Sequence, residues 1–184
     1  NKPRGWNPSF KSLKRKNMTQ LTREKTFAAI WQALKNGKKF FIAGHQNPDG
    51  DSLGCTLTMV SLLTRLGKES YAYATPAIGS DLKFLPALQQ VHVDTLPEKP
   101  DFDTVILLEC SDRTRGGNLE SVLQNAKTII NIDHHLISDE YGDINYIDSS
   151  ASSTAEIIFQ LFEASEDNLL PTPEEATCLY TGLE

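Results

Sequence analysis

The sequence predicts an α/β protein in which a parallel β-sheet is covered by helices on both faces. Segments with strand character alternate with segments of helical periodicity along the chain. The strand-like segments, such as residues 104–108 (Thr-Val-Ile-Leu-Leu), are continuous apolar runs, which indicates burial on both faces. Polar clusters directly follow three of these segments, and open parallel sheets bind ligands beyond the carboxyl ends of their strands.

The expected strands are short apolar runs bounded by turn-forming residues. They are residues 39–43, 70–74, 104–108, 128–132 and a short extended piece at 144–147. The first strand centres on Phe40-Phe41-Ile42 and runs directly into Gly44 and His45. A turn-like Pro-Asp-Phe-Asp stretch precedes the 104–108 strand.

The expected helices carry apolar residues three and four positions apart. They are residues 22–36, 52–66, 118–125, 153–164 and 173–183, with a short helix at 80–88. Gly37 and Gly67 stand where the first two should stop. Pro173 suits the first turn of the last helix, with Thr172 as its N-cap.

Charge is distributed unevenly over the 184 residues. Residues 1–17 hold six basic residues and no acidic ones, so the rest has 12 basic against 24 acidic residues, a net charge of −12. We expect residues 1–17 to be a flexible basic tail or a leader before Met18, or alternatively an arm that touches nucleic acid or membrane. Residues 18–184 would form one domain. The acidic body argues against duplex DNA as a ligand, because duplex binding requires many phosphates to be neutralised.

The cysteine pattern and hydropathy favour a cytoplasmic protein. Cys55, Cys110 and Cys178 are widely spaced and odd in number, which argues against a disulfide framework or a zinc knuckle. We expect them to be small core residues in a reducing compartment. No apolar run approaches the ~20 residues that a membrane span needs, and no signal-peptide segment follows the basic N-terminus.

The first polar cluster, residues 45–52, follows the 39–43 strand and precedes a helix. His45, Asp49 and Asp51 fall within seven residues, and Pro48 and Gly50 impose a turn that lets them converge. Carboxylate oxygens with an imidazole nitrogen suit manganese, magnesium or a similar dication. Taken alone, the cluster also fits an Asx-rich turn with a helix cap.

Two further clusters follow the third and fourth strands. Glu109 and Asp112 are followed by Arg113 and Arg115, an order that suits a ligand and a phosphate clamp, although a surface salt bridge fits equally well. The other cluster is Asp133-His134-His135, for which a polar strand end with a core histidine is the alternative. Of the four histidines only His92 lies outside the clusters, and we expect it to be structural or exposed.

Together these motifs resemble those of the DHH phosphoesterases, a RecJ-like family. The resemblance rests on His45-x-x-x-Asp49-x-Asp51-Ser52, on Asn131-Ile132-Asp133-His134-His135, and on residues 147–156 (Ile-Asp-Ser-Ser-Ala-Ser-Ser-Thr-Ala-Glu). The last segment is similar to the branch of oligoribonucleases and 3′-phosphoadenosine 5′-phosphate phosphatases. The resemblance covers roughly residues 39–184 and implies the fold of the family's N-terminal catalytic domain.

The resemblance implies two divalent cations, with manganese as the expected metal and magnesium or cobalt as alternatives. The implied ligands are His45 and Asp49 for one cation, Asp51 and His134 for the other, and Glu109 as the bridge between them. Two metals would lower the pKa of a shared water and clamp the phosphoryl oxygens.

The remaining implied site residues are placed around the metals. Asp133 would orient His134, since ligating histidines usually have such a partner. His135 would meet the substrate phosphate as a catalytic residue, and Arg115 would contact substrate or hold its loop. Ser153 and Thr154 are the expected substrate-binding residues.

Two features depart from the family pattern. The second motif normally offers Asp, whereas this chain has Glu109, which is one methylene longer; Asp112 is a candidate substitute. Residues 178–184 resemble the start of a fourth motif whose metal-binding Asp would follow about two residues later. We therefore expect a domain truncated before that motif, without the C-terminal substrate domain, and a fragment that is weak or inactive by itself.

The implied function is hydrolysis of short oligoribonucleotides, of 3′-phosphoadenosine 5′-phosphate, or of both, to nucleoside monophosphates. One alternative is a cyclic-dinucleotide phosphodiesterase, and another is a pyrophosphatase or exopolyphosphatase. Pyrophosphatases typically have a histidine at the position of Cys110, which disfavours the pyrophosphatase or exopolyphosphatase alternative. A RecJ-like single-strand exonuclease would need a basic groove. A non-catalytic nucleotide-binding relic is the alternative that Glu109 and the missing fourth motif support. The expected partner is a short RNA or small nucleotide, and a homodimer stays open.

Overall fold

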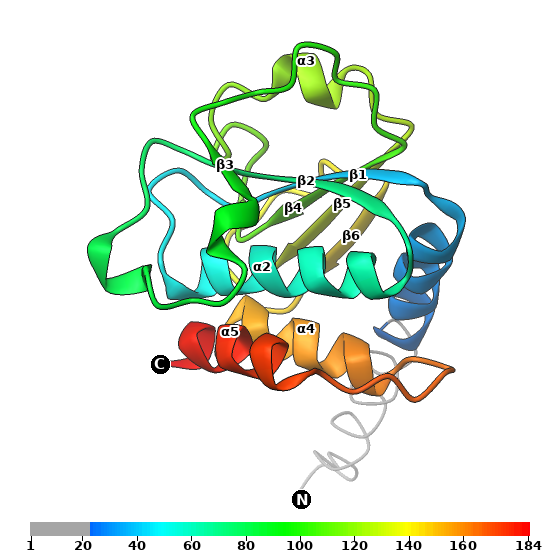
Figure 1. Ribbon diagram of the computed structural model, residues 1–184. Helices are drawn as coiled ribbons and strands as arrows, with labels where there is room; N and C mark the ends of the chain where they lie inside the picture. The colour runs from blue at the N-terminus through cyan, green and yellow to red at the C-terminus, as the bar shows by residue number, and fades with distance from the viewer. Residues whose placement is uncertain (1–22) are drawn as a thin grey trace, which may run out of the picture.

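The computed structural model describes residues 23–184 and contains a six-stranded sheet in which all neighbouring strands are parallel. The strand order is β3-β2-β1-β4-β5-β6. The chain therefore starts in the middle of the sheet, builds outward to one edge, and crosses back to build the other half (Figure 1). The predicted fold class is confirmed, whereas the expected tail at residues 1–17 lies outside the described residues.

Five of the six strands lie where the apolar runs predict them. The strands are β1 (Lys39–Ala43), β2 (Glu69–Ala74), β3 (Val91–Val93), β4 (Thr104–Leu108), β5 (Thr128–Asp133) and β6 (Ile144–Ile147). All five residues of β4 are buried, as expected for a strand in the middle of a sheet covered on both faces.

Alternate residues of the central strands β1 and β4 belong to separate hydrophobic clusters on the two faces. On one face Phe40 and Ile42 pack with the N-terminal helix (residues 23–36), α2 (Gly50–Arg65) and α4 (Thr154–Glu163). On the other face Phe41 and Ala43 pack with the short helix α3 (Glu120–Leu123) and its flanking loops. Figure 1 shows α2 and α4 on one side of the sheet and α3 on the other.

Helix α5 (Pro173–Leu183) packs on α2 from the side remote from the sheet (Figure 1). The close approach of α5 to α2 requires glycine residues on α2. A Cβ atom at Gly54 would collide with the carbonyl oxygen of Cys178, and one at Gly50 would lie 2.6 Å from that of Thr181. The N-terminus of α5 has a capping box between Thr172 and Glu175.

Local predictions fail mainly between β2 and β4. Residues 80–88 do not form one helix: two 3₁₀ turns, Ser80–Leu82 and Leu88–Gln90, flank Pro86 and a left-handed Ala87. Strand β3 was not predicted, because it is a three-residue edge strand that is mostly exposed. Its His92 is exposed and stacks on Tyr71, with ring centroids 3.9 Å apart, which agrees with the structural role expected for it.

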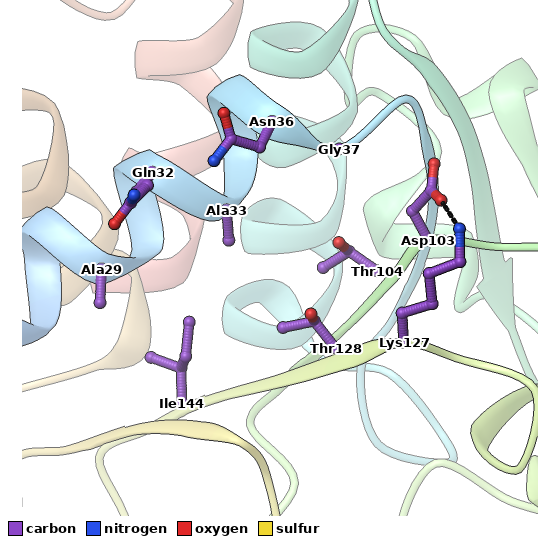
Figure 2. A pocket seen from close by; sticks show the side chains of 10 residues that line it. All are labelled: Ala29, Gln32, Ala33, Asn36, Gly37, Asp103, Thr104, Lys127, Thr128 and Ile144. Atoms are coloured by element: carbon purple, nitrogen blue, oxygen red, sulfur yellow. Dashed lines mark hydrogen bonds and ion pairs between the residues drawn. The ribbon is translucent and has the colours of Figure 1, made fainter.

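The amino-terminal edge of the sheet carries a cavity of about 390 Å³ (Figure 2). It lies between the N-terminal helix and the first residues of β4, β5 and β6, and the ion pair of Lys127 with Asp103, 2.8 Å long, lies at its side. None of the predicted site residues lines it. Within residues 23–184, no helix combines the length and hydropathy required to span a bilayer.

Candidate metal centre

The three polar clusters meet at the carboxyl edge of the sheet. His45 follows β1, Glu109 follows β4, and Asp133 ends β5, and these three strands are neighbours. The strand order reverses between β1 and β4, the position at which open α/β sheets bind ligands. The topology therefore brings together side chains that the sequence separates by up to 90 positions.

The first cluster is shaped by the start of α2. Asp49 is the N-cap of α2, and its Oδ1 accepts a hydrogen bond of 2.9 Å from the backbone nitrogen of Ser52. The other Asp49 oxygen lies 3.4 Å from Nε2 of His45, while Nδ1 of His45 lies 2.8 Å from the carbonyl oxygen of Gln46. The contact with Asp49 raises the pKa of His45 despite its burial and lowers the pKa of Asp49 to about 2.

Glu109 occupies the centre of the site. Its backbone is left-handed, with φ of 61°, and its side chain is buried. Oε1 lies 3.1 Å from Nε2 of His134, and Oε2 lies 3.9 Å from Nε2 of His45. Burial, and then the nearby charge of Asp51, raise the pKa of the Glu109 carboxyl. A buried carboxylate between two imidazoles is poised to attract cationic charge.

The Asp133-His134-His135 segment is ordered by the Asp133 carboxylate. Its Oδ1 accepts hydrogen bonds from the backbone nitrogens of His134 and His135 and lies 2.7 Å from Nδ1 of His135. Burial raises the pKa of Asp133, but its hydrogen bonds with His135 outweigh that effect and the net shift is downward. The ring of His134 instead contacts the carbonyl oxygen of Ala151, at 3.3 Å. Asp133 thus holds the ring of His135, not that of His134 as the resemblance implied.

Two sets of side chains in residues 23–184 have the composition and spacing of cation sites. One is His45, Asp49 and Glu109, and the other is Glu109, His134 and His135; in each set the donor atoms lie within 4.8 Å of one another. Glu109 is common to both. Neither set contains Asp112, whose Oδ1 accepts hydrogen bonds from the backbone nitrogen and hydroxyl of Thr114.

Asp51 lies at the site but is tied to the N-terminus of α4. Its two oxygens accept hydrogen bonds of 2.7 and 2.8 Å from the backbone nitrogens of Thr154 and Ala155, and Cys55 donates to it at 3.3 Å. Oδ2 lies 4.0 Å from Nε2 of His134. The contact with Cys55 could have been anticipated, since residues four apart on a helix are neighbours.

Ser153, Thr154 and Arg115, which the sequence resemblance assigned to the substrate, differ in burial and hydrogen bonding. Ser153 is buried as the N-cap of α4 and accepts a hydrogen bond from the backbone of Glu156, and the buried hydroxyl of Thr154 donates to Glu109. Neither side chain faces solvent, where substrate would arrive. Arg115 is half-buried in the loop after β4, and its carbonyl oxygen accepts a hydrogen bond from Gln46 at 2.7 Å.

These features define an α/β protein with a histidine–carboxylate centre at the carboxyl edge of a parallel sheet. The chain belongs to the DHH family: the model of the "DHH family, N-terminal domain" matches residues 39–183. The centre described above lies within that matched stretch.

The curated relatives include proteins named as oligoribonucleases and PAP phosphatases and proteins named as cyclic-di-AMP phosphodiesterases. The chain is 32% identical over 145 residues to the "Bifunctional oligoribonuclease and PAP phosphatase NrnA" of Thermus thermophilus, covering 78% of this chain and 41% of the relative. It is 29% identical to the protein of the same name from Bacillus subtilis, covering 76% and 43%. It is 26% identical to the "Cyclic-di-AMP phosphodiesterase PdeA" of Listeria monocytogenes, covering 84% and 26%. The chain thus spans less than half the length of these relatives.

Solved structures share the fold. An exopolyphosphatase-related protein from Bacteroides fragilis aligns with a TM-score of 0.78 at 24% identity, over 86% of this chain and 49% of that one. RecJ in complex with Mn²⁺ from Thermus thermophilus aligns with a TM-score of 0.51 at 21% identity, over 87% and 23%.

Proposed function

We propose that this chain is the metal-binding domain of a phosphoesterase that hydrolyses short oligoribonucleotides, 3′-phosphoadenosine 5′-phosphate, or both, to nucleoside monophosphates. The observation that carries the proposal is the position of Glu109. Its two carboxylate oxygens face histidines from different strand ends, so that one side chain belongs to two candidate cation sites. A carboxylate shared by two sets of donors suits a pair of closely spaced cations.

The residues fit two divalent cations by the chemistry of their donors. His45 and Asp49 would hold one, His134 with Asp51 the other, and Glu109 both. Carboxylate oxygens and imidazole nitrogens together favour manganese, with magnesium or cobalt as alternatives. Such a pair, when bound, lowers the pKa of a water and offsets charge on the phosphoryl oxygens. Asp51 retains lone pairs for this role beyond those used by the α4 backbone.

His135 and Arg115 are the residues proposed to act on the substrate itself. With Nδ1 of His135 held by Asp133, Nε2 is the ring nitrogen left to meet a phosphate oxygen or to protonate the leaving group. Among the described residues, no carboxylate pairs with the guanidinium of Arg115, whereas Arg113 pairs with Glu120 at 3.3 Å. Arg115 is therefore the arginine that we assign to the phosphate.

The choice of substrate follows the relatives and the charge. Both NrnA proteins are named as oligoribonucleases and PAP phosphatases, and a small nucleotide suits a chain whose body carries excess negative charge. The name of the Listeria relative supports a cyclic dinucleotide as the second candidate.

The test is hydrolysis of pApA, 3′-phosphoadenosine 5′-phosphate and cyclic di-AMP, each with Mn²⁺ and with EDTA. It should use the 184-residue chain and, if the gene encodes further residues, its full product. We expect Mn²⁺-dependent release of AMP from the first two substrates. Turnover of cyclic di-AMP alone would favour the second candidate, and no turnover of any of the three substrates by the full gene product would refute the proposal.

A matched pair of arginine variants tests the site within the same assay. Arg115→Met should reduce turnover by about 10- to 100-fold, because it removes a charged hydrogen-bond donor to phosphate. Arg113→Met, which breaks only an exposed ion pair, should leave turnover nearly unchanged.

Titration with Mn²⁺ distinguishes an enzyme from a non-catalytic nucleotide-binding relic. We expect two ions to bind per chain, and binding of one ion or none would support the relic.

A further inference from the structure

The first residue of α4 contacts two acids of the site at once. The hydroxyl of Thr154 donates a hydrogen bond of 2.8 Å to Oε1 of Glu109, and its backbone nitrogen donates one of 2.7 Å to Oδ2 of Asp51. Thr154 is fully buried, and the atoms that it contacts come from Glu109, directly after β4, and from Asp51 in α2. One residue thus joins three elements at the centre of the site.

Glu109 depends on an external partner to stay in place. A glutamate has one more rotatable bond than an aspartate, so its carboxylate can occupy more positions, and fixing it costs more conformational entropy. Within residues 23–184, Thr154 is the one hydroxyl donor to Oε1 of Glu109, whose other near contacts are His134 at 3.1 Å and His135 at 3.9 Å. In the proposed centre His134 would bind a cation, and Nδ1 of His135 is held by Asp133, which leaves the Thr154 hydroxyl as the contact that stays.

The direction of the hydroxyl follows from backbone structure. Ser153 caps α4 in an extended conformation, and the nitrogens of Thr154 and Ala155 are bound to Asp51. These contacts fix the start of the helix on α2. Because the backbone of Thr154 is fixed in this way, its side-chain hydroxyl lies next to the Glu109 carboxylate.

We propose that Thr154 is a positioning residue, whose hydroxyl holds the Glu109 carboxylate between His45 and His134 so that a glutamate can bridge the two cation sites. This inference rests on the proposed metal centre. It replaces the substrate-binding role that sequence resemblance suggested for Thr154 with an action on Glu109.

The test compares the Mn²⁺ affinity of two variants of the 184-residue chain with that of the wild type, measured by calorimetry. Thr154→Val keeps the shape and the backbone bond to Asp51 but removes the hydroxyl. We expect it to weaken Mn²⁺ binding by about 10- to 100-fold, the usual effect of losing a partner of a metal ligand. Thr154→Ser keeps the hydroxyl and should stay within about threefold of the wild type.

A matched control is Thr58→Val on α2. Thr58 is also fully buried, and its hydroxyl has no hydrogen-bond partner among the described residues, so the change should leave Mn²⁺ affinity unaltered. Thermal unfolding without metal is recorded for all variants. If Thr154→Val unfolds at a lower temperature but binds Mn²⁺ with wild-type affinity, the inference is overturned, because the role of Thr154 would then be structural only.

A double-mutant cycle with Glu109→Asp gives an independent check. The shorter side chain cannot reach the Thr154 hydroxyl in the same way, so Thr154→Val should weaken Mn²⁺ binding much less in the Glu109→Asp background. Additive effects would contradict the proposed contact. Failure of the wild type to bind Mn²⁺ would remove the metal centre itself, whereas normal wild-type binding with an unaffected Thr154→Val removes only the inference.

Discussion

Glu109 and His134 lie at the carboxyl ends of neighbouring strands, and Oε1 of the first is 3.1 Å from Nε2 of the second. The backbone of Glu109 is left-handed, directly after the last residue of β4. The two strand ends thus place a carboxylate oxygen and an imidazole nitrogen face to face.

Removal of the shared carboxylate should affect both cation sites. In Glu109→Ala each set loses one of its three donors, so we expect Mn²⁺ stoichiometry to fall below two per chain and affinity to fall by at least about 100-fold. Calorimetric titration measures both quantities. Glu120→Ala, which removes an exposed glutamate paired with Arg113, serves as control. Two ions bound at wild-type affinity in Glu109→Ala would rule out the bridging role.

Asp133→Asn should impair turnover more than metal binding. The buried carboxylate holds Nδ1 of His135 through Oδ1. In the asparagine variant an NH₂ group would take the place of Oδ2, which has no hydrogen-bond partner within the described residues, so the amide would be buried without an acceptor. We expect kcat on pApA to fall by about 10- to 100-fold. Mn²⁺ affinity should change less, because the ring of His134 contacts Ala151 and not Asp133. An unaltered kcat would show that His135 needs no orientation by Asp133.

Gly54→Ala should destabilise the domain by separating α5 from α2. The added methyl group would overlap the carbonyl oxygen of Cys178, and overpacking of this kind costs about 1–3 kcal/mol. Gly67→Ala is the comparison: that glycine has φ of 69° and open space around it, so only the left-handed backbone opposes the change, at about 1–2 kcal/mol. Urea unfolding monitored by circular dichroism measures both. Wild-type stability of Gly54→Ala would show that the helices can move apart freely.

The stability contributed by Asp103 should depend on pH. The hydrogen bond from Lys127, followed by those from the backbone nitrogens of Lys38 and Lys39, lowers the pKa of Asp103 to about 2. A lowered carboxyl pKa adds stability above the ordinary value near 4 and loses it as the pH falls toward 2. Asp103→Asn should therefore be less stable than the wild type at pH 7, by under about 1 kcal/mol because solvent screens the group.

That stability difference should shrink between pH 4 and pH 2, and urea unfolding at pH 7, 4 and 3 would record its decline. Asp101→Asn, which removes a more exposed carboxylate near Lys39, is the control and should change little at any of these pH values. A constant difference between Asp103→Asn and the wild type would mean that the charge of Asp103 does not contribute.

The sequence by itself determined the class of fold and the three strand ends that carry the site. Residues 39–43, 104–108 and 128–132 are continuous apolar runs, and burial on both faces follows from that composition alone. Because parallel strands end at the same edge of a sheet, His45, Glu109 and His134 could be expected to converge. These inferences succeed because they use short-range pattern and a general property of parallel sheets.

The tertiary structure alone decided which atoms meet at that edge. The bonds of Asp51 to the start of α4 join residues about 100 positions apart, and the Thr154–Glu109 contact joins residues 45 apart. The fit of α5 against Gly54 likewise depends on how two helices cross. Side-chain partners of this kind depend on the relative placement of whole elements, which local periodicity does not encode, so a residue predicted to touch substrate can instead hold an acid.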